Sequence, residues 1–282
     1  MRQVFLVSAC LAGGLFLSAC AKDDPASVER AFQDVNVVDE TDLNDVMLSA
    51  ADPNEAVSYF TRSLQGNTNR IDLQRGLAIS LVRAKRNTEA VSAWKKVNSL
   101  DGATNDDKVD LADALIRNGD WKAAKAALDD VPPTHETFKR YRLEAMVADA
   151  NKEWKRADSF YEIAVSLTTR PAGVMNNWGY SKLTRGDYTD AERLFGEAIR
   201  QDQALFTAKN NLVLARGAQR NYTLPVIPMG QIERAQLLHT LALTAIKQGD
   251  VSTGEGLLRD AISTHPQHFE EAVRSLRALE SA

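Results

Sequence analysis

Apolar and polar positions along this chain repeat with a period of about 34 residues from Val37 onward. Each period holds two runs with apolar residues at helical spacing, and a turn rich in Gly, Asn or Asp separates the runs. The periods begin at residues 37, 71, 105, 138, 172, 206 and 235. Unrelated amphipathic helices would not keep such a register. The pattern therefore predicts an all-α array of helix pairs across residues 37–268.

Three positions of the period carry the same kind of residue in successive units. The eighth is small in units two to five, with Asn44 as the departure in the first unit. The twentieth is alanine in the first five units: Ala56, Ala90, Ala124, Ala157 and Ala191. The twenty-fourth is large and apolar or aromatic: Phe60, Trp94, Leu128, Tyr161 and Phe195. Small residues facing large ones predict closely packed helix pairs.

The clearest unit spans Ala172–Leu205 and contains Asn177-Trp178-Gly179-Tyr180 followed by Arg185-Gly186-Asp187-Tyr188. Gly186 can adopt positive φ to end one helix, and Asp187 can cap the next. This arrangement resembles the tetratricopeptide repeat (TPR). The resemblance implies a helix-hairpin solenoid that winds as a right-handed superhelix, with about six to seven units.

Two segments depart from the repeat. The sixth unit is interrupted at residues 222–230, where Pro225 and Pro228 exclude a regular helix. Its apolar residues predict an extended strap packed on the array: Leu224, Val226, Ile227 and Met229. After the strap, Gln231–Gln248 is expected to form one long helix. Residues 269–282 place apolar side chains on one helical face, which predicts a C-terminal capping helix over the open end of the solenoid.

The N-terminus is typical of an export signal with a lipid-acceptor cysteine. Arg2 is followed by an uncharged apolar stretch, and Leu17-Ser18-Ala19-Cys20 resembles a bacterial lipobox. We therefore expect a lipoprotein signal peptide at 1–19, a diacylglyceryl thioether on Cys20 and a polar tether over 20–36. Two alternatives are an ordinary signal peptide with an incidental cysteine and an uncleaved anchor. A lipidated Cys20 predicts attachment to a membrane through acyl chains.

Composition and motifs argue against several function classes. The net charge is -4, and lysine and arginine do not cluster along the sequence as nucleic-acid binding would require. A nucleic-acid partner is therefore not expected. The sequence lacks a phosphate-binding glycine loop, a nucleophile elbow and a zinc-protease motif, so we expect neither an enzyme nor a small-molecule substrate. His265 and His268 flank Pro266 in a turn, where exposed histidines are a better interpretation than a metal site. No cofactor is expected besides the lipid on Cys20.

The TPR resemblance directs attention to the first helix of each unit, which lines the concave face in that family. Carrying those positions over gives a set of candidate protein-binding residues: Arg75, Arg83, Arg142, Asn176, Asn177, Tyr180, Asn210, Asn211 and His239. An asparagine amide both donates and accepts, which suits a ligand backbone, but these asparagines could equally join neighbouring repeats. The arginines could meet a carboxylate or simply be solvated.

The C-terminal half is similar to one particular group, the TadD-type lipoproteins of the tight-adherence (Flp-type) pilus system. The similarity rests on Asn176-Asn177-Trp178-Gly179, the Pro-x-x-Pro strap, Glu233–His239 and Ala261–Phe269. It implies a pilotin-like assembly factor that binds an outer-membrane secretin or another pilus component. With Ala21 after the cysteine, it also implies an outer-membrane location facing the periplasm. The alternative is a periplasmic TPR scaffold or activator of peptidoglycan-synthesis enzymes.

Overall fold

The computed structural model describes residues 43–281, and every regular element in that range is a helix. The expected all-α class is therefore confirmed for the described chain. The signal peptide at 1–19, Cys20, the tether at 20–36 and the start of the first unit lie outside the described residues. None of the helices within 43–281 combines the length and apolarity that a bilayer crossing requires.

The helices form consecutive antiparallel pairs. The first helices of the units are α3 (Ile71–Arg83), α5 (Asn105–Arg117), α7 (Phe138–Ala150), α9 (Ala172–Thr184), α11 (Phe206–Ala218) and α12 (Gln231–Lys247). The second helices are α2 (Pro53–Ser63), α4 (Asn87–Asn98), α6 (Trp121–Asp129), α8 (Trp154–Ser166), α10 (Tyr188–Gln201) and α13 (Val251–Thr264). Residues 43–49 form a helical segment before α2, and α14 (Glu270–Glu280) closes the array. Helices α3, α5, α7, α9 and α11 begin at the residues where the sequence period begins.

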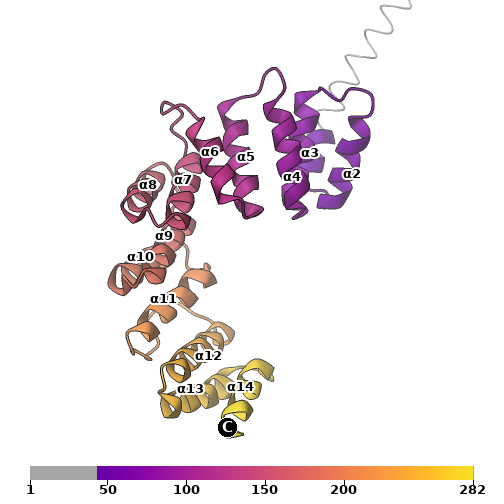
Figure 1. Ribbon diagram of the computed structural model, residues 1–282. Helices are drawn as coiled ribbons and strands as arrows, with labels where there is room; N and C mark the ends of the chain where they lie inside the picture. Colours follow the sequence, from indigo (N-terminus) through magenta and orange to yellow (C-terminus); the bar gives the residue numbers. More distant parts are fainter. Residues whose placement is uncertain (1–42, 282) are drawn as a thin grey trace, which may run out of the picture.

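The array bends, so its two ends lie on the same side of the molecule (Figure 1). Helices α7 and α9 follow the inner side of the bend, and α8 and α10 follow the outer side. In the middle of the array, the concave surface is thus built largely from the first helix of each unit.

The recurring small residues let the helices of a pair approach one another. The alanines at the twentieth position are completely buried. Gly179 lies so close to its partner helix that an added Cβ would stand 2.7 Å from the ring of Phe195. A glycine at this position therefore makes room for the fully buried phenylalanine.

The turn inside each pair uses the same backbone conformation in six successive units. The fifteenth residue of units two to seven has positive φ, between 58° and 85°. Glycine occupies this position in three units, as Gly119, Gly186 and Gly249, whereas the other three use Lys85, Lys152 and Arg220. A left-handed residue here ends the first helix, and in every one of these units except the sixth it turns the chain into the second helix.

The interrupted sixth unit has no helix between α11 and α12 from residue 219 to residue 230. Leu224, Ile227 and Met229 pack against the apolar clusters of the neighbouring helices, as expected. The expectation for Val226 is wrong, because its side chain is fully exposed, at 105%. Val226 follows Pro225 at a bend of the strap, and its side chain faces solvent while the next residue, Ile227, packs on the core.

At the C-terminal end, α14 covers the last pair of helices. Ala272 is completely buried, and Leu276 and Leu279 pack against the cluster that α12 and α13 form. Phe269, the residue before α14, is 8% exposed and joins the same cluster. The helix therefore shields apolar surface that the array would otherwise leave open.

Candidate protein-binding site

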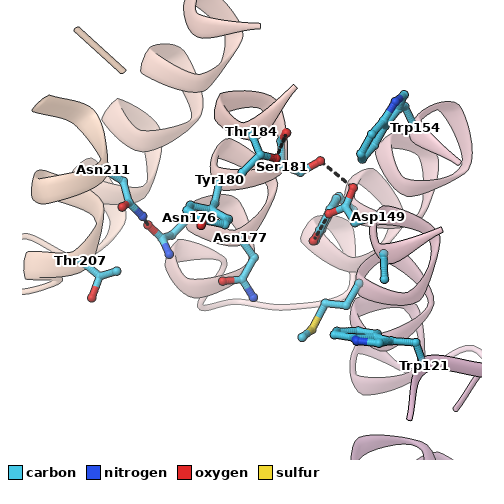
Figure 2. A pocket seen from close by; sticks show the side chains of 13 residues that line it. Trp121, Asp149, Trp154, Asn176, Asn177, Tyr180, Ser181, Thr184, Thr207 and Asn211 are labelled. Atoms are coloured by element: carbon cyan, nitrogen blue, oxygen red, sulfur yellow. Dashed lines mark hydrogen bonds between the residues drawn. The ribbon is translucent and has the colours of Figure 1, made fainter. Parts of the chain in front are cut away.

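A cavity of about 520 Å³ opens between α7, α9 and α11, with Trp121 of α6 and Trp154 and Tyr161 of α8 at its edge. We call it the Tyr180 cavity. Figure 2 shows Tyr180 and Asn177 on one side of it, with Asp149 and Trp121 on the other. Since α7 and α9 follow the inner side of the bend, the cavity belongs to the concave surface. Tyr180 and Asn177 were expected on this surface from the sequence.

Three groups in this cavity remain available for a ligand. Tyr180 is 53% exposed and Trp121 is 36% exposed, and neither ring stacks on another ring or on a cation within residues 43–281. Asn177 is partly buried and makes no hydrogen bond within that range. Exposed aromatic rings next to an unpaired amide are typical of a protein interaction surface.

The neighbouring asparagines instead join the repeats. The Nδ2 amide of Asn211 donates to Oδ1 of Asn176 at 3.0 Å, and both side chains are buried. Asn210 accepts a 2.8 Å hydrogen bond from the hydroxyl of Thr240. The sequence left open whether these asparagines contact a ligand or join neighbouring repeats. Asn176, Asn210 and Asn211 join repeats, although Asn176 and Asn211 also border the Tyr180 cavity.

Asp149 supplies the carboxyl group of the cavity. It accepts hydrogen bonds from the hydroxyl of Ser181 at 2.6 Å and from that of Tyr161 at 2.8 Å. Burial raises the pKa of Asp149 above its ordinary value, and these two hydrogen bonds offset part of the effect. Burial next to this carboxylate likewise raises the pKa of Tyr161, so the phenol stays protonated. The carboxylate is therefore fixed in position at the wall of the cavity.

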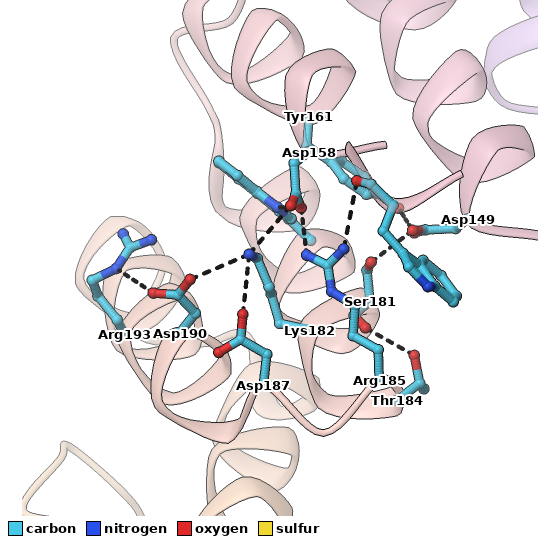
Figure 3. Close-up of polar contacts among 12 residues, drawn as sticks. Asp149, Asp158, Tyr161, Ser181, Lys182, Thr184, Arg185, Asp187, Asp190 and Arg193 are labelled. Atoms are coloured by element: carbon cyan, nitrogen blue, oxygen red, sulfur yellow. Dashed lines mark hydrogen bonds and ion pairs between the residues drawn. The ribbon is translucent and has the colours of Figure 1, made fainter. Parts of the chain in front are cut away.

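A polar network behind the cavity fixes α8 and α9 relative to each other (Figure 3). Asp158 accepts from Nε1 of Trp178 at 2.7 Å and from Arg185 at 2.6 Å. The ammonium group of Lys182 lies 3.2–3.3 Å from carboxylate oxygens of Asp158, Asp187 and Asp190. Burial acts to raise the pKa of Asp158, but the hydrogen bonds from Trp178 and Arg185 outweigh it. The pKa of Asp158 is therefore below its ordinary value. Such a network holds the walls of the cavity in place before any ligand binds.

A second cavity of about 340 Å³ adjoins the first, and both are bordered by Asn176, Asn177 and Thr207. We call it the Arg142 cavity. Its two cations are Arg142 and Arg170, and neither forms an ion pair within residues 43–281. The guanidinium of Arg142 lies 5.9 Å from the ring centre of Phe138, while its Nε is buried without a hydrogen-bond partner. An unpaired cation and a buried donor favour an anionic group of a ligand here.

Three other candidates from the sequence serve the array itself. Arg75 forms a two-point contact with Asp107, with both N···O distances at 2.7 Å. Arg83 donates to the backbone carbonyls of Met47 and Ala51. His239 contacts the hydroxyl of Ser275 and packs edge-on against Phe269, and burial lowers its pKa. None of the three lines either cavity.

Sequence reasoning missed several residues that line the two cavities: Trp121, Asp149, Trp154, Arg170 and Thr207. One signal could have identified two of them. Trp121 and Trp154 occupy the seventeenth position of their units, the first residue of the second helix. In these two units the aromatic residue at that position lies at the edge of the Tyr180 cavity.

The turn histidines have partners within the chain. His265 stacks on Phe269 with ring centres 4.9 Å apart, and Nε2 of His268 lies 2.8 Å from Glu270. Within residues 43–281, no three side chains of metal-ligating type gather into a possible site.

The sequence matches no protein-family model and no curated protein. Its structure is similar to a tetratricopeptide repeat protein from Parabacteroides merdae, with a TM-score of 0.58 and 11% identity, over 85% of this chain and 96% of that one. It is also similar to the C-terminal part of a TPR repeat-containing protein from Cytophaga hutchinsonii, with a TM-score of 0.52 and 14% identity, over 83% and 98% of the two chains.

The APC/C hetero-tetramer Cut9–Hcn1 gives a TM-score of 0.60 at 13% identity over 84% of this chain. This chain spans only 48% of the length of the chain it matches there. At such identities the likeness concerns the fold. Together with the helix-pair architecture, it confirms that the described chain is a TPR solenoid.

Proposed function

We propose that this chain is a protein-binding assembly factor, anchored to the outer membrane by a lipid on Cys20 and acting in a tight-adherence (Flp-type) pilus system. The client is an outer-membrane secretin or another component of that machinery. The anchor and the pilus assignment rest on the lipobox-like Leu17–Cys20 and on the resemblance of residues 176–276 to TadD-type lipoproteins. The binding role rests on the TPR fold and its concave surface.

One observation carries the binding role, namely that the two adjoining cavities present groups without internal partners. Asn177 borders both, Tyr180 exposes an aromatic ring in one, and Arg142 brings an unpaired guanidinium to the other. The surrounding side chains are already fixed by hydrogen bonds, so a client segment would bind a preformed site. Binding of an extended segment would let Asn177 contact its backbone while side chains enter the cavities.

The anchor adds to such a role in a simple way. Acyl chains on Cys20 would confine the solenoid to the membrane surface, which raises its effective concentration toward a client in the same membrane. A moderate affinity at the concave site would then be enough for assembly. The same reasoning applies to the alternative, a scaffold for peptidoglycan-synthesis enzymes, which differs in the identity of the client.

Site-specific photo-crosslinking of the lipidated full chain in its native cells tests this proposal. A photoreactive phenylalanine analogue at Tyr180 probes the concave site, and the same analogue at Arg200, an exposed residue of α10 that lines neither cavity, is the matched control. We expect mass spectrometry to identify a secretin or pilus component crosslinked from position 180 and not from position 200.

The other outcomes are equally informative. Cell-wall synthases crosslinked from position 180 would replace the pilus assignment with the alternative and retain the binding site. Crosslinks from position 200 alone would show that the concave cavities are not the binding surface.

A further inference from the structure

The Tyr180 cavity has a one-sided charge distribution. Asp149 is the only charged residue among those that line it, and the lining includes no lysine, arginine or histidine. The other lining groups are aromatic, apolar or neutral and polar. A carboxylate that no cation contacts, in a largely apolar cavity, attracts a positive group and repels a negative one.

The aromatic rings of the cavity suit the same kind of group. Tyr180 and Trp121 stand on opposite sides of it, both exposed and both without a stacking partner within residues 43–281 (Figure 2). Trp154 already holds the guanidinium of Arg185, which lies 5.6 Å from its ring centre. Electron-rich ring faces attract cations, and the chain itself uses one ring of this cavity in that way.

Asp149 retains capacity for another donor. An ionised carboxylate has about four acceptor positions, and the hydroxyls of Ser181 and Tyr161 use two of them. The nearby cation Arg185 is engaged by Asp158, so it does not neutralise Asp149 directly. Burial of the carboxylate raises its pKa, and a bound cation would relieve that cost of burying the charge.

We infer that the Tyr180 cavity binds a basic side chain, arginine or lysine, of the client segment, with Asp149 as the counter-charge and Tyr180 and Trp121 as the flanking rings. This inference rests on the proposed binding function and adds the chemistry of the ligand. The Arg142 cavity across Asn177 has the opposite charge, so the two cavities would also set the direction of a segment that carries one basic and one acidic residue.

Two short peptides with the same shape and different charge test the inference. Acetyl-Gly-Arg-Gly-amide carries a guanidinium, and its citrulline counterpart replaces that group with a neutral urea of nearly the same size. Binding of each to the lipidated full chain in detergent micelles is measured by ligand-observed NMR. We expect the arginine peptide to bind about tenfold more tightly than the citrulline peptide, as a charge-assisted contact with flanking rings would give.

Three variants locate the effect. Asp149→Asn removes the charge with little change of shape, and Tyr180→Leu removes a half-exposed ring that makes no hydrogen bond and no ring contact within residues 43–281. Each should reduce the preference for arginine to about twofold or less, a loss of most of the tenfold ratio. Asp260→Asn removes an exposed carboxylate of α13, far from the cavity, and should leave the preference unchanged. Because Tyr180→Leu disturbs no hydrogen bond, it remains informative even if Asp149→Asn weakens the fold.

Equal binding of the two peptides to the unaltered chain would overturn the inference, as would a full preference in the Tyr180→Leu variant. These results are separable from the test of the proposed function. A client crosslinked from position 180 without any preference for arginine would leave the function standing and remove the basic side chain from it. A preference for arginine without a crosslinked client would support the cavity chemistry and count against the proposed function.

Discussion

The Nδ2 amide of Asn211 donates a 3.0 Å hydrogen bond to Oδ1 of Asn176, one helix pair earlier in the array. Both side chains are buried, whereas the next residue along α9, Asn177, has no hydrogen bond within residues 43–281. Adjacent asparagines of one helix thus have different surroundings. Both residues border the two cavities, but only the amide of Asn177 is left without a hydrogen bond there.

This difference predicts opposite effects of two alanine substitutions. Asn211→Ala leaves the buried oxygen of Asn176 without its donor and should lower the free energy of unfolding by about 1–3 kcal/mol. Asn177→Ala removes no hydrogen bond within residues 43–281 and should change it by less than about 0.5 kcal/mol while weakening client binding. Urea unfolding followed by circular dichroism checks both variants. Equal losses of stability would show that Asn177 also supports the fold.

The contact between Gly179 and Phe195 predicts that a single methyl group is harmful. In Gly179→Ala the new Cβ would lie 2.7 Å from the phenylalanine ring, so the pair of helices must separate, at a cost of about 1–3 kcal/mol. Gly196→Ala in α10 is the matched control, because its nearest neighbour would be 3.7 Å away. Removing a helical glycine there should stabilise the protein by about 0.5–1 kcal/mol. Thermal melting curves of both variants should therefore shift in opposite directions.

The contact between Arg75 and Asp107 predicts a pH-dependent contribution to stability. Burial acts to raise the pKa of Asp107, but hydrogen bonds from Arg75 and Thr104 outweigh it and hold the pKa below the ordinary value of 3.8. Since the folded state lowers this pKa, the stabilisation is present above about pH 4 and is lost as the pH falls through the folded-state pKa.

In Arg75→Gln the pKa of Asp107 should rise, because the hydrogen bonds from the guanidinium are lost while the effect of burial stays. We expect a loss of about 1–2 kcal/mol at pH 7 and acid unfolding that begins at a higher pH than in the unaltered chain. Arg86→Gln is the control, since its contact with Glu89 is exposed to solvent and should matter little. Urea midpoints measured from pH 3 to pH 7 check the prediction. Parallel profiles for the Arg75→Gln variant and the unaltered chain would contradict it.

The lipoprotein prediction concerns Cys20, outside the described residues. Cys20→Ser removes the thiol that would carry diacylglycerol, so the protein should no longer fractionate with the outer membrane or incorporate labelled palmitate. Cys10→Ser should leave both readouts unchanged, because Cys10 lies within the expected signal peptide. Membrane attachment that survives Cys20→Ser would refute the lipid anchor.

The repeat itself was predictable from sequence because its contacts are local. Positions eight, twenty and twenty-four meet within one unit or between neighbours, so the kind of residue at each position was enough to locate the starts of α3, α5, α7, α9 and α11. The C-terminal helix was predictable for the same reason, since its apolar face has the spacing of one amphipathic helix.

The site was only partly predictable. The pattern placed Asn177, Tyr180 and Arg142 on the first helices of their units, but it could not distinguish a free side chain from one with a partner. Arg75 has the same position in its unit as Asn176 and Arg142, yet it contacts Asp107 of the next unit. The cavity also depends on Trp121 and Asp149, which belong to different units and come together where α6 of one unit packs against α7 of the next.

The helices of residues 43–281 pack mainly against the next one or two helices in chain order. Folding such a chain requires the closure of short loops only. A pair of helices can therefore form as soon as it and the neighbouring pair have been synthesised. The order of synthesis or export can then also be the order of folding. On that route the Tyr180 cavity is completed once α11 docks on α9, before the strap and the capping helix have been added.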